Sequence, residues 1–293
     1  MEETAIGFAG GKKTEAAMGC FEKVELNLFG GTIMTDINDL FRERVGLAEA
    51  ETITMDSLHE LLEKTAWTFP FENSRVLNDT TRPLTKENLI QKLLVENEGG
   101  LCYELNPLLY FFLLENGFDV RMVRGEVFVE AKQDWTNLGR THVAIILQYK
   151  GQSWLVDTGF GGNLPLRPVP FTGETVNSGN GEFRVKQSDS KYGNYRLEMK
   201  LRHKQSDWHI GYAFDTNRPV NKVPELEEVQ DIIKHHDQSP FNKNPLAVQL
   251  TVDGSKTLTD SSYTEWIHGK KEKREIDKRA FQTLAREQFG IEF

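Results

Sequence analysis

Cysteine is scarce in this chain: Cys20 and Cys102 are the only two among its 293 residues. No Cys-x-x-Cys pair occurs, so a disulfide framework and a cysteine-rich structural zinc site are both excluded. Long apolar runs are missing as well. No stretch approaches the roughly 18 apolar residues of a membrane-spanning helix, and the N-terminus lacks the apolar segment of a signal peptide. We therefore expect a cytoplasmic protein in which Cys102 is reduced.

Positive charge is also in short supply, since 35 lysine and arginine residues face 44 aspartate and glutamate residues and give a net charge of −9. This acidic balance argues against a general nucleic-acid or anionic-membrane surface, so we expect neither partner. Metal ligands in a usable arrangement are missing too. His235 and His236 are adjacent on a predicted helix and point in different directions, so we expect no metal site.

What the chain does contain is a change of hydrophobic period along its length. Residues 1–33 have early glycines and only weak alternation, so we expect an N-terminal tail that is disordered or is a translated upstream extension. Residues 34–118 carry apolar side chains at helical spacing and predict a helical domain. In residues 119–215 the period becomes two, which predicts an antiparallel sheet or barrel. Residues 216–293 mix predicted strands and helices.

The segment around Cys102 lies between two predicted helices. Gly99 and Gly100 give the backbone freedom that ends the first helix, and leucines at helical spacing follow in the second. Cys102 is therefore expected in the first turn of a helix, where unpaired N–H groups and the helix dipole favour a thiolate. The alternative is a buried, inert cysteine that packs as a small hydrophobe. A histidine and a carboxylate elsewhere in the chain are needed to decide between the two.

A predicted β-hairpin supplies that histidine and carboxylate. His142 begins one strand and Asp157 ends the next, with Lys150 and Gly151 as the two-residue turn between them. In this register Asp157 lies opposite Ala144, on the same face as His142, and moving the turn by one residue keeps it on that face. Diagonal neighbours are about 7–8 Å apart at the backbone, so the carboxylate and the imidazole are within hydrogen-bonding reach.

Cys102, His142 and Asp157 follow one another in the chain at separations of 40 and 15 residues. In such a set of three groups the imidazole takes the proton of the thiol. The carboxylate fixes the tautomer of the imidazole and stabilises the imidazolium that forms. The pattern predicts nucleophilic catalysis. We interpret Phe160, in the glycine-rich segment 159–162, as an aromatic wall beside the site, the alternative being a plain turn with a core phenylalanine.

Four segments in order resemble the arylamine N-acetyltransferases. They are residues 70–73 (PFEN), 99–106 (GGLCYELN), 141–143 (THV) and 156–161 (VDTGFG). The resemblance extends from about residue 34 to the C-terminus. It implies an α+β fold with a helical N-terminal domain over residues 34–118, an antiparallel β-barrel over 119–215 and a C-terminal α/β lid over 216–293. The catalytic groups would have the papain-like Cys-His-Asp arrangement.

The resemblance also implies an activity and roles for individual residues. Cys102, His142 and Asp157 would form the catalytic triad, Phe71 and Phe160 would line the acceptor pocket, and Gly139 would lie near bound coenzyme A. Acetyl-CoA would be the cosubstrate. Its acetyl group would pass through an acetyl-cysteine to the nitrogen of an arylamine or arylhydrazine in a ping-pong mechanism. No metal would take part.

Two other classes of protein share some of these features. A cysteine hydrolase or transglutaminase-like enzyme would use the same triad without coenzyme A, and a non-enzymatic coenzyme A binder would form no acetyl-cysteine. One position departs from the family pattern: arginine usually precedes the two glycines, and this chain has Glu98. An ionised carboxylate cannot donate the hydrogen bonds that arginine would supply, so the turn before Cys102 must be held in another way.

Overall fold

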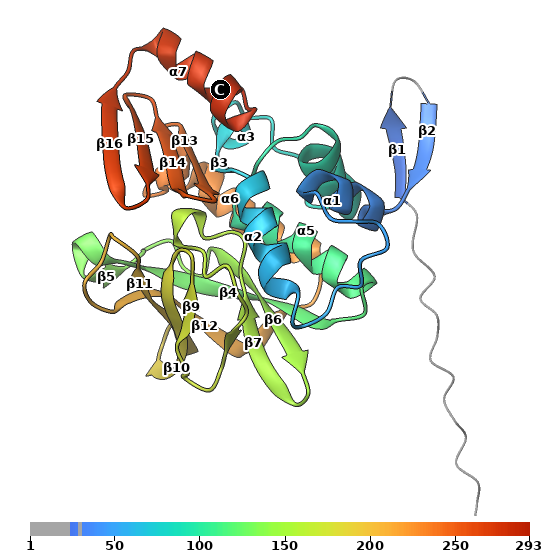
Figure 1. The fold of residues 1–293 in the computed structure, drawn as a ribbon, viewed down its shortest axis with the longest axis vertical. Helices are drawn as coiled ribbons and strands as arrows, with labels where there is room; N and C mark the ends of the chain where they lie inside the picture. The colour runs from blue at the N-terminus through green and yellow to red at the C-terminus, as the bar shows by residue number, and fades with distance from the viewer. Residues whose placement is uncertain (1–23, 29–30) are drawn as a thin grey trace, which may run out of the picture.

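The computed structural model describes residues 24–28 and 31–293, which form a group of helices, a β-barrel and a smaller sheet (Figure 1). Most of the tail expected over residues 1–33 lies outside the described residues. In its described part, β1 (Val24–Leu28) and β2 (Gly31–Thr35) form an antiparallel ladder. Among the described residues, no helix is both long and apolar enough to cross a membrane.

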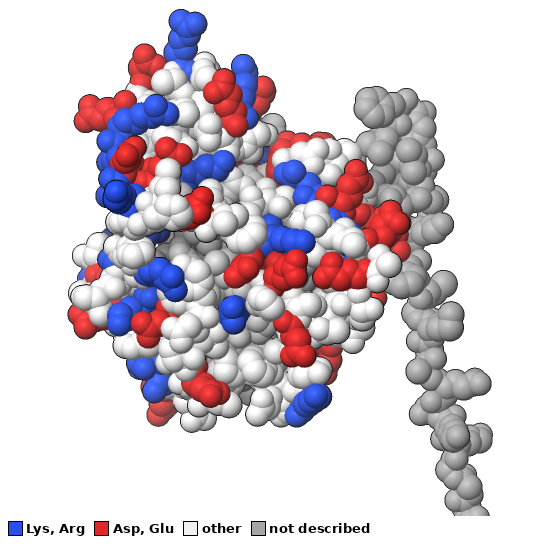
Figure 2. Space-filling view, viewed as in Figure 1, with Lys and Arg blue, Asp and Glu red and all other residues white. Residues whose placement is uncertain are grey.

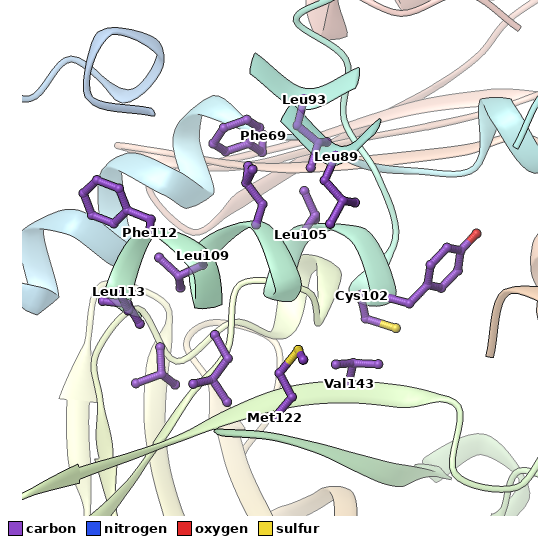
Figure 3. Packing of buried hydrophobic residues seen from close by; sticks show 14 of the residues in the cluster. Phe69, Leu89, Leu93, Cys102, Leu105, Leu109, Phe112, Leu113, Met122 and Val143 are labelled. Atoms are coloured by element: carbon purple, nitrogen blue, oxygen red, sulfur yellow. The ribbon is translucent and has the colours of Figure 1, made fainter. Parts of the chain in front are cut away.

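Helix α5 (Cys102–Glu115) is the centre of the helical region. Apolar side chains cover most of its circumference, so the helix is buried between two layers. Figure 3 shows Phe69 on one side of it and Met122 and Val143 of the barrel on the other, with Cys102 at its N-terminal end. The other helices are α1 (Ile37–Val45), α2 (Leu58–Thr68), α3 (Ser74–Leu77) and α4 (Lys86–Ile90), the last continuing as a π-helical turn over Gln91–Val95.

The barrel is an antiparallel sheet in the order β8-β7-β6-β4-β12-β11-β10-β9, and it is nearly closed because β10 packs near β8. Apolar side chains fill its interior, among them Val123, Ile146, Phe183, Leu197 and Phe214. Its strands are β4 (Asp119–Val129), β5 (Asp134–Trp135), β6 (His142–Tyr149), β7 (Gln152–Val156), β8 (Val169–Pro170), β9 (Val176–Ser178), β10 (Gly181–Ser190), β11 (Gly193–Leu201) and β12 (His209–Val220).

The hairpin of β6 and β7 has the register that the sequence predicts. Tyr149 pairs with Gln152, and Ile145 pairs with Val156. Lys150 and Gly151 form the turn with φ angles of 49° and 77°, and two positive φ values are typical of the type I′ turn that suits a two-residue hairpin loop. The pairing places Asp157, which directly follows β7, on the same face as His142.

The C-terminal region is a five-stranded sheet covered by helix α7 (Figure 1). Its outer strand β3 (Phe71–Glu72) comes from the helical region and pairs with β13, which joins the two regions. The remaining elements are β13 (Leu246–Thr251), β14 (Gly254–Thr259), β15 (Ser262–Ile267), β16 (Lys270–Glu275), α6 (Glu227–His235) and α7 (Lys278–Leu284), extended by a π-helical turn over Ala285–Phe289.

The predicted α+β fold is confirmed, with its helical region, barrel and C-terminal α/β region. Strand β12 continues to Val220, beyond the boundary expected at residue 215, because its pairing with β4 resumes at Pro219 after a register shift that begins at Phe214. How the chain divides into separately folding domains stays a prediction. On the face drawn in Figure 2, acidic and basic side chains of the described residues are interspersed.

Candidate active site

Cys102 is the first residue of α5, and its surroundings hold that end of the helix tightly. The Glu104 carboxylate accepts a hydrogen bond from the Leu101 N–H at 3.0 Å, which satisfies one of the free donors at the helix start. The Cys102 side chain is buried, and its Sγ lies 3.4 Å from the carbonyl oxygen of Thr141. A Cβ at Gly159 would lie 2.6 Å from the Cys102 Cα, so only glycine fits this close approach.

His142 and Asp157 form the second half of the site. His142 Nε2 lies 2.7 Å from Asp157 Oδ2, and both side chains are buried. Cys102 is near enough to His142 to help raise the pKa of the imidazole. The structure therefore brings together all three residues that the sequence predicts as a triad, from the start of α5, the start of β6 and the end of β7.

The electrostatics of the site favour a charged histidine. Burial alone would lower the pKa of His142, but the charge and the hydrogen bond of Asp157, together with the neighbouring Cys102, raise it to about 10. Burial would likewise raise the pKa of Asp157, yet His142, Asn106 and the Gly159 N–H hold it below its ordinary value. An imidazolium between a carboxylate and a thiol is the arrangement that stabilises a thiolate.

Three neutral hydrogen-bond donors surround Asp157. The side-chain amide of Asn106 donates to Oδ1 at 2.9 Å, the Gly159 N–H donates to the same oxygen at 2.8 Å, and the Tyr212 hydroxyl donates to Oδ2 at 2.8 Å. Sequence reasoning missed Asn106 and Tyr212 as site residues. Asn106 lies four residues after Cys102 and so shares its helix face, a spacing that could have identified it. Tyr212 lies on β12, and no feature of the sequence around it indicates that it reaches the site.

Cys102 and His142 border a cavity of about 540 Å³ with mostly apolar walls. Phe71 and Phe160, which the resemblance implies as lining residues of the acceptor pocket, both line this cavity. The Phe160 ring centroid is 4.9 Å from that of His142, and the Phe71 ring is 5.6 Å from that of Phe241 in an edge-on contact. The other apolar lining residues are Leu101, Tyr103, Val127, Val129, Leu138, Ile233, Pro240, Leu246 and Val248.

Gly139 does not line this cavity. It has a φ of 74° and borders a separate polar groove of about 500 Å³, together with Arg140, Lys191 and Arg218. The chain crosses from groove to cavity within two residues, because Thr141 lines the cavity. The position of Gly139 beside bound coenzyme A stays a prediction. No group of three His, Cys, Asp or Glu side chains that could hold a metal ion occurs in the part of the chain that the structure describes.

The turn before Cys102 is held by charged groups. Glu98 pairs with Arg75, whose Nε and Nη2 each lie 2.7 Å from a carboxylate oxygen of Glu98. Deeper in the protein, Lys92 Nζ lies 2.6 Å from Glu104 and 3.6 Å from Glu72. Burial would lower the pKa of Lys92, but the two carboxylates raise it, so this buried lysine is charged.

Comparison with known proteins gives a consistent result. Residues 54–293 match the family model of the N-acetyltransferases. Over 221 residues the chain is 40% identical to YvcN of Bacillus subtilis, an uncharacterized acetyltransferase, and the match covers 75% of this chain and 85% of that protein.

Solved structures resemble this one over most of its length. Arylamine N-acetyltransferase C from Bacillus anthracis is 38% identical, with a TM-score of 0.83 and coverage of 88% of this chain and 100% of that one. The arylamine N-acetyltransferase NAT3 from Bacillus cereus is 40% identical, with a TM-score of 0.83 and coverage of 89% and 100%. That enzyme is described as having a unique Cys-His-Glu catalytic triad, whereas Asp157 occupies the acidic position beside His142 here.

Proposed function

Because the chain belongs to the arylamine N-acetyltransferase family, we propose that it transfers an acetyl group from acetyl-CoA to the nitrogen of arylamines or arylhydrazines. The observation that carries the proposal is the hydrogen-bonded pair of His142 and Asp157, which lies with Cys102 at the wall of an apolar cavity. The three residues are proposed as the catalytic triad. The reaction divides into two half-reactions that share Cys102.

In the first half-reaction the Cys102 thiolate attacks the carbonyl carbon of the acetyl thioester. The bond between that carbon and the coenzyme A sulfur then breaks, and the departing sulfur takes a proton from the His142 imidazolium. The products are free coenzyme A, an acetyl-cysteine and a neutral histidine. Asp157 keeps the imidazole in the orientation that this transfer needs.

In the second half-reaction the amine nitrogen attacks the acetyl-cysteine, and neutral His142 accepts the proton that the nitrogen loses. Cys102 leaves as a thiolate, which restores the thiolate–imidazolium pair. An aromatic amine suits this step because its nitrogen is neutral and nucleophilic at pH 7. We propose that Phe71 and Phe160 bind its ring, since both line the cavity beside Cys102.

Coenzyme A is proposed to pass Gly139 on its way out of the cavity. Two features support this: Gly139 is two residues from the cavity-lining Thr141, and the groove that Gly139 borders contains Arg140 and Lys191, whose charges suit phosphate groups. A requirement for a reduced thiol and for acetyl-CoA fits a cytoplasmic enzyme.

The test is a mass spectrum of the intact protein after mixing with acetyl-CoA and no amine. We expect one acetyl group on Cys102, and an aromatic amine added afterwards should remove it and yield the N-acetyl product. Cys102→Ala should abolish labelling, and the matched control Cys20→Ala should not. Acetyl on Cys20 or on lysines would contradict the proposal. Hydrolysis of the acetyl-enzyme as fast as an amine accepts its acetyl group would favour a cysteine hydrolase instead.

A further inference from the structure

The turn that precedes Cys102 is built into a backbone ladder. The Gly100 N–H donates to the Pro70 carbonyl at 3.1 Å, and the Glu72 N–H donates to the Gly100 carbonyl at 3.1 Å. A Cβ at Gly99 would lie 2.1 Å from the Pro70 carbonyl oxygen, so the two segments touch along their backbones. Any shift of the segment at residues 70–75 is therefore transmitted to the turn, and through Leu101 to Cys102.

One ion pair joins the same two segments on their outer side. Arg75, on α3, offers two N–H groups to the two oxygens of Glu98, which directly precedes Gly99. The side chains are 14% and 26% exposed, so the pair is largely shielded from water. A planar guanidinium facing a carboxylate with two parallel hydrogen bonds fixes direction as well as distance. The hydrogen bonding of Arg75 to the Glu98 carboxylate is also the largest influence that raises the pKa of Arg75.

No other cation in the described part of the chain forms an ion pair with Glu98. Lys92 is directed to Glu104 and Glu72. Arg82 contacts Glu96, which also contacts Arg75. The hydrogen bonds that an arginine before the glycines would donate therefore come here from the opposite side of the turn, where Arg75 is the donor and Glu98 the acceptor.

We propose that Arg75 is a positioning residue which, paired with Glu98, forms a charge-reversed clamp on the nucleophile turn and fixes Cys102 for attack. The clamp replaces the arginine that usually stands before the two glycines in the family that this chain resembles. The proposal deepens the proposed function and rests on Cys102 being the nucleophile. It has an unusual consequence: restoring arginine at position 98 is harmful, because the new guanidinium would face Arg75.

The experiment is a charge swap that compares Glu98→Arg, Arg75→Glu and the double variant. The rate constant for acetylation of Cys102 by acetyl-CoA is measured by rapid quench and mass spectrometry. We expect each single variant to lose about 10²-fold, a typical cost of misplacing a reacting group by about 1 Å. The concentration of acetyl-CoA at half-maximal rate should stay unchanged, because neither residue lines the cavity. The double variant should recover to within about tenfold of the wild type, because the reversed pair regains most of its hydrogen bonds. The remaining loss reflects Glu96, which keeps no ion pair with position 75 in that variant.

A second readout separates this proposal from the proposed function. Alkylation of Cys102 by iodoacetamide depends on the placement and ionisation of the thiol but not on acetyl transfer. Its rate should fall in both single variants and recover in the double variant, even if acetyl-CoA proves not to be the substrate. Failure of the wild type to form acetyl-cysteine would overturn the proposed function alone.

Two further variants guard against a trivial result. Arg82→Glu reverses a neighbouring arginine that is 40% exposed and pairs with Glu96, and it should change the rate by less than about twofold. If the single charge reversals fail to fold, Glu98→Gln keeps the size of the side chain, and loss of its charge should lower the rate about tenfold while thermal stability stays near wild type. A wild-type rate in Glu98→Arg or Glu98→Gln, or a double variant no faster than the singles, would overturn the clamp.

Discussion

The two halves of the site are supported by different kinds of interaction. The half that holds the proposed nucleophile Cys102, called here the nucleophile half, lies at the start of α5 and is held by ion pairs: Arg75 with Glu98, and Lys92 with Glu104. The half that holds the proposed acid–base pair His142 and Asp157, called here the acid–base half, is held by neutral donors that surround the single carboxylate of Asp157. An ion pair keeps its attraction when both signs are reversed, whereas three donors that converge on one acceptor require that acceptor. We therefore expect the Arg75–Glu98 pair to tolerate reversal of both charges together, and Asp157 not to tolerate reversal of its charge.

Asp157→Asn should show the largest effect, because it removes the one acceptor on which the second half depends. An amide offers one oxygen where the carboxylate offers two, so at least one surrounding donor loses its partner. The amide also cannot stabilise imidazolium, and we expect a loss of about 10⁴-fold in the acetylation rate, as in the comparable serine triad. Rapid-quench kinetics and thermal unfolding measure rate and fold separately. Near-normal turnover in a folded variant would remove Asp157 from the mechanism.

Lys92→Met tests the buried ion pair of the nucleophile half. The Lys92 side chain is 7% exposed and lies between Glu104 and Glu72, so methionine would leave two buried carboxylates without a cation. Removing one partner of a buried pair costs about 3–5 kcal/mol in the free energy of unfolding, which denaturant titration measures. Lys64→Met is the matched control: Lys64 pairs with Glu60 near the surface, and its loss should cost less than about 0.5 kcal/mol. If Lys92→Met is as stable as this control, ion pairs do not hold the nucleophile half together.

The pH dependence of stability should also separate the two halves. The pKa of His142 is raised in the folded state to about 10 from an ordinary value of 6.5. The stability that this shift contributes is therefore fully present below pH 6.5 and is lost as pH rises toward 10. The difference in unfolding free energy between the wild type and His142→Gln should shrink over that interval. A difference that stays flat or grows with pH would mean that the buried imidazolium does not form.

The parts of the site that the sequence predicts are those fixed by local signals. A two-residue turn and strict alternation determine the His142–Asp157 pairing, and two glycines before an apolar helix place Cys102. Tyr212 could not be predicted in the same way, because it reaches Asp157 only through the pairing of β12 with β4, strands far apart in the chain. The role of Arg75 could not be predicted either, because nothing near it in sequence indicates that Glu98 is its partner.

Within the fold, β16 (Lys270–Glu275) shows the same limit. Its charges of mixed sign suggest a solvated segment and do not indicate a strand, and the structure places it as an exposed edge strand paired with β15. All its side chains are exposed, so it has no buried face and no apolar alternation to reveal it. Charged side chains on an edge strand discourage pairing with another chain, which is a physical reason for such a sequence to stand at the edge of the sheet.

Tyr212→Phe should show the smallest effect, because it removes one neutral donor and leaves the acceptor in place. Asp157 Oδ2 keeps its contact with His142, and the phenylalanine ring can keep the packing of Tyr212, whose ring centroid lies 4.3 Å from that of His142 and 5.1 Å from that of Phe160. One lost hydrogen bond to a charged group is worth about 1.5 kcal/mol, so the acetylation rate should fall about tenfold with little change in thermal stability.

Tyr263→Phe provides the matched control for that variant. It also removes a hydroxyl that donates to a carboxylate, that of Glu265 at 2.9 Å, but it does so in the C-terminal sheet, outside the cavity lining. Its acetylation rate should equal that of the wild type. If Tyr212→Phe also leaves the rate unchanged, the hydroxyl does not help to orient Asp157. A loss as large as that of Asp157→Asn would instead mean that the donors act as one unit, so that removing any one of them has the same effect as removing the acceptor.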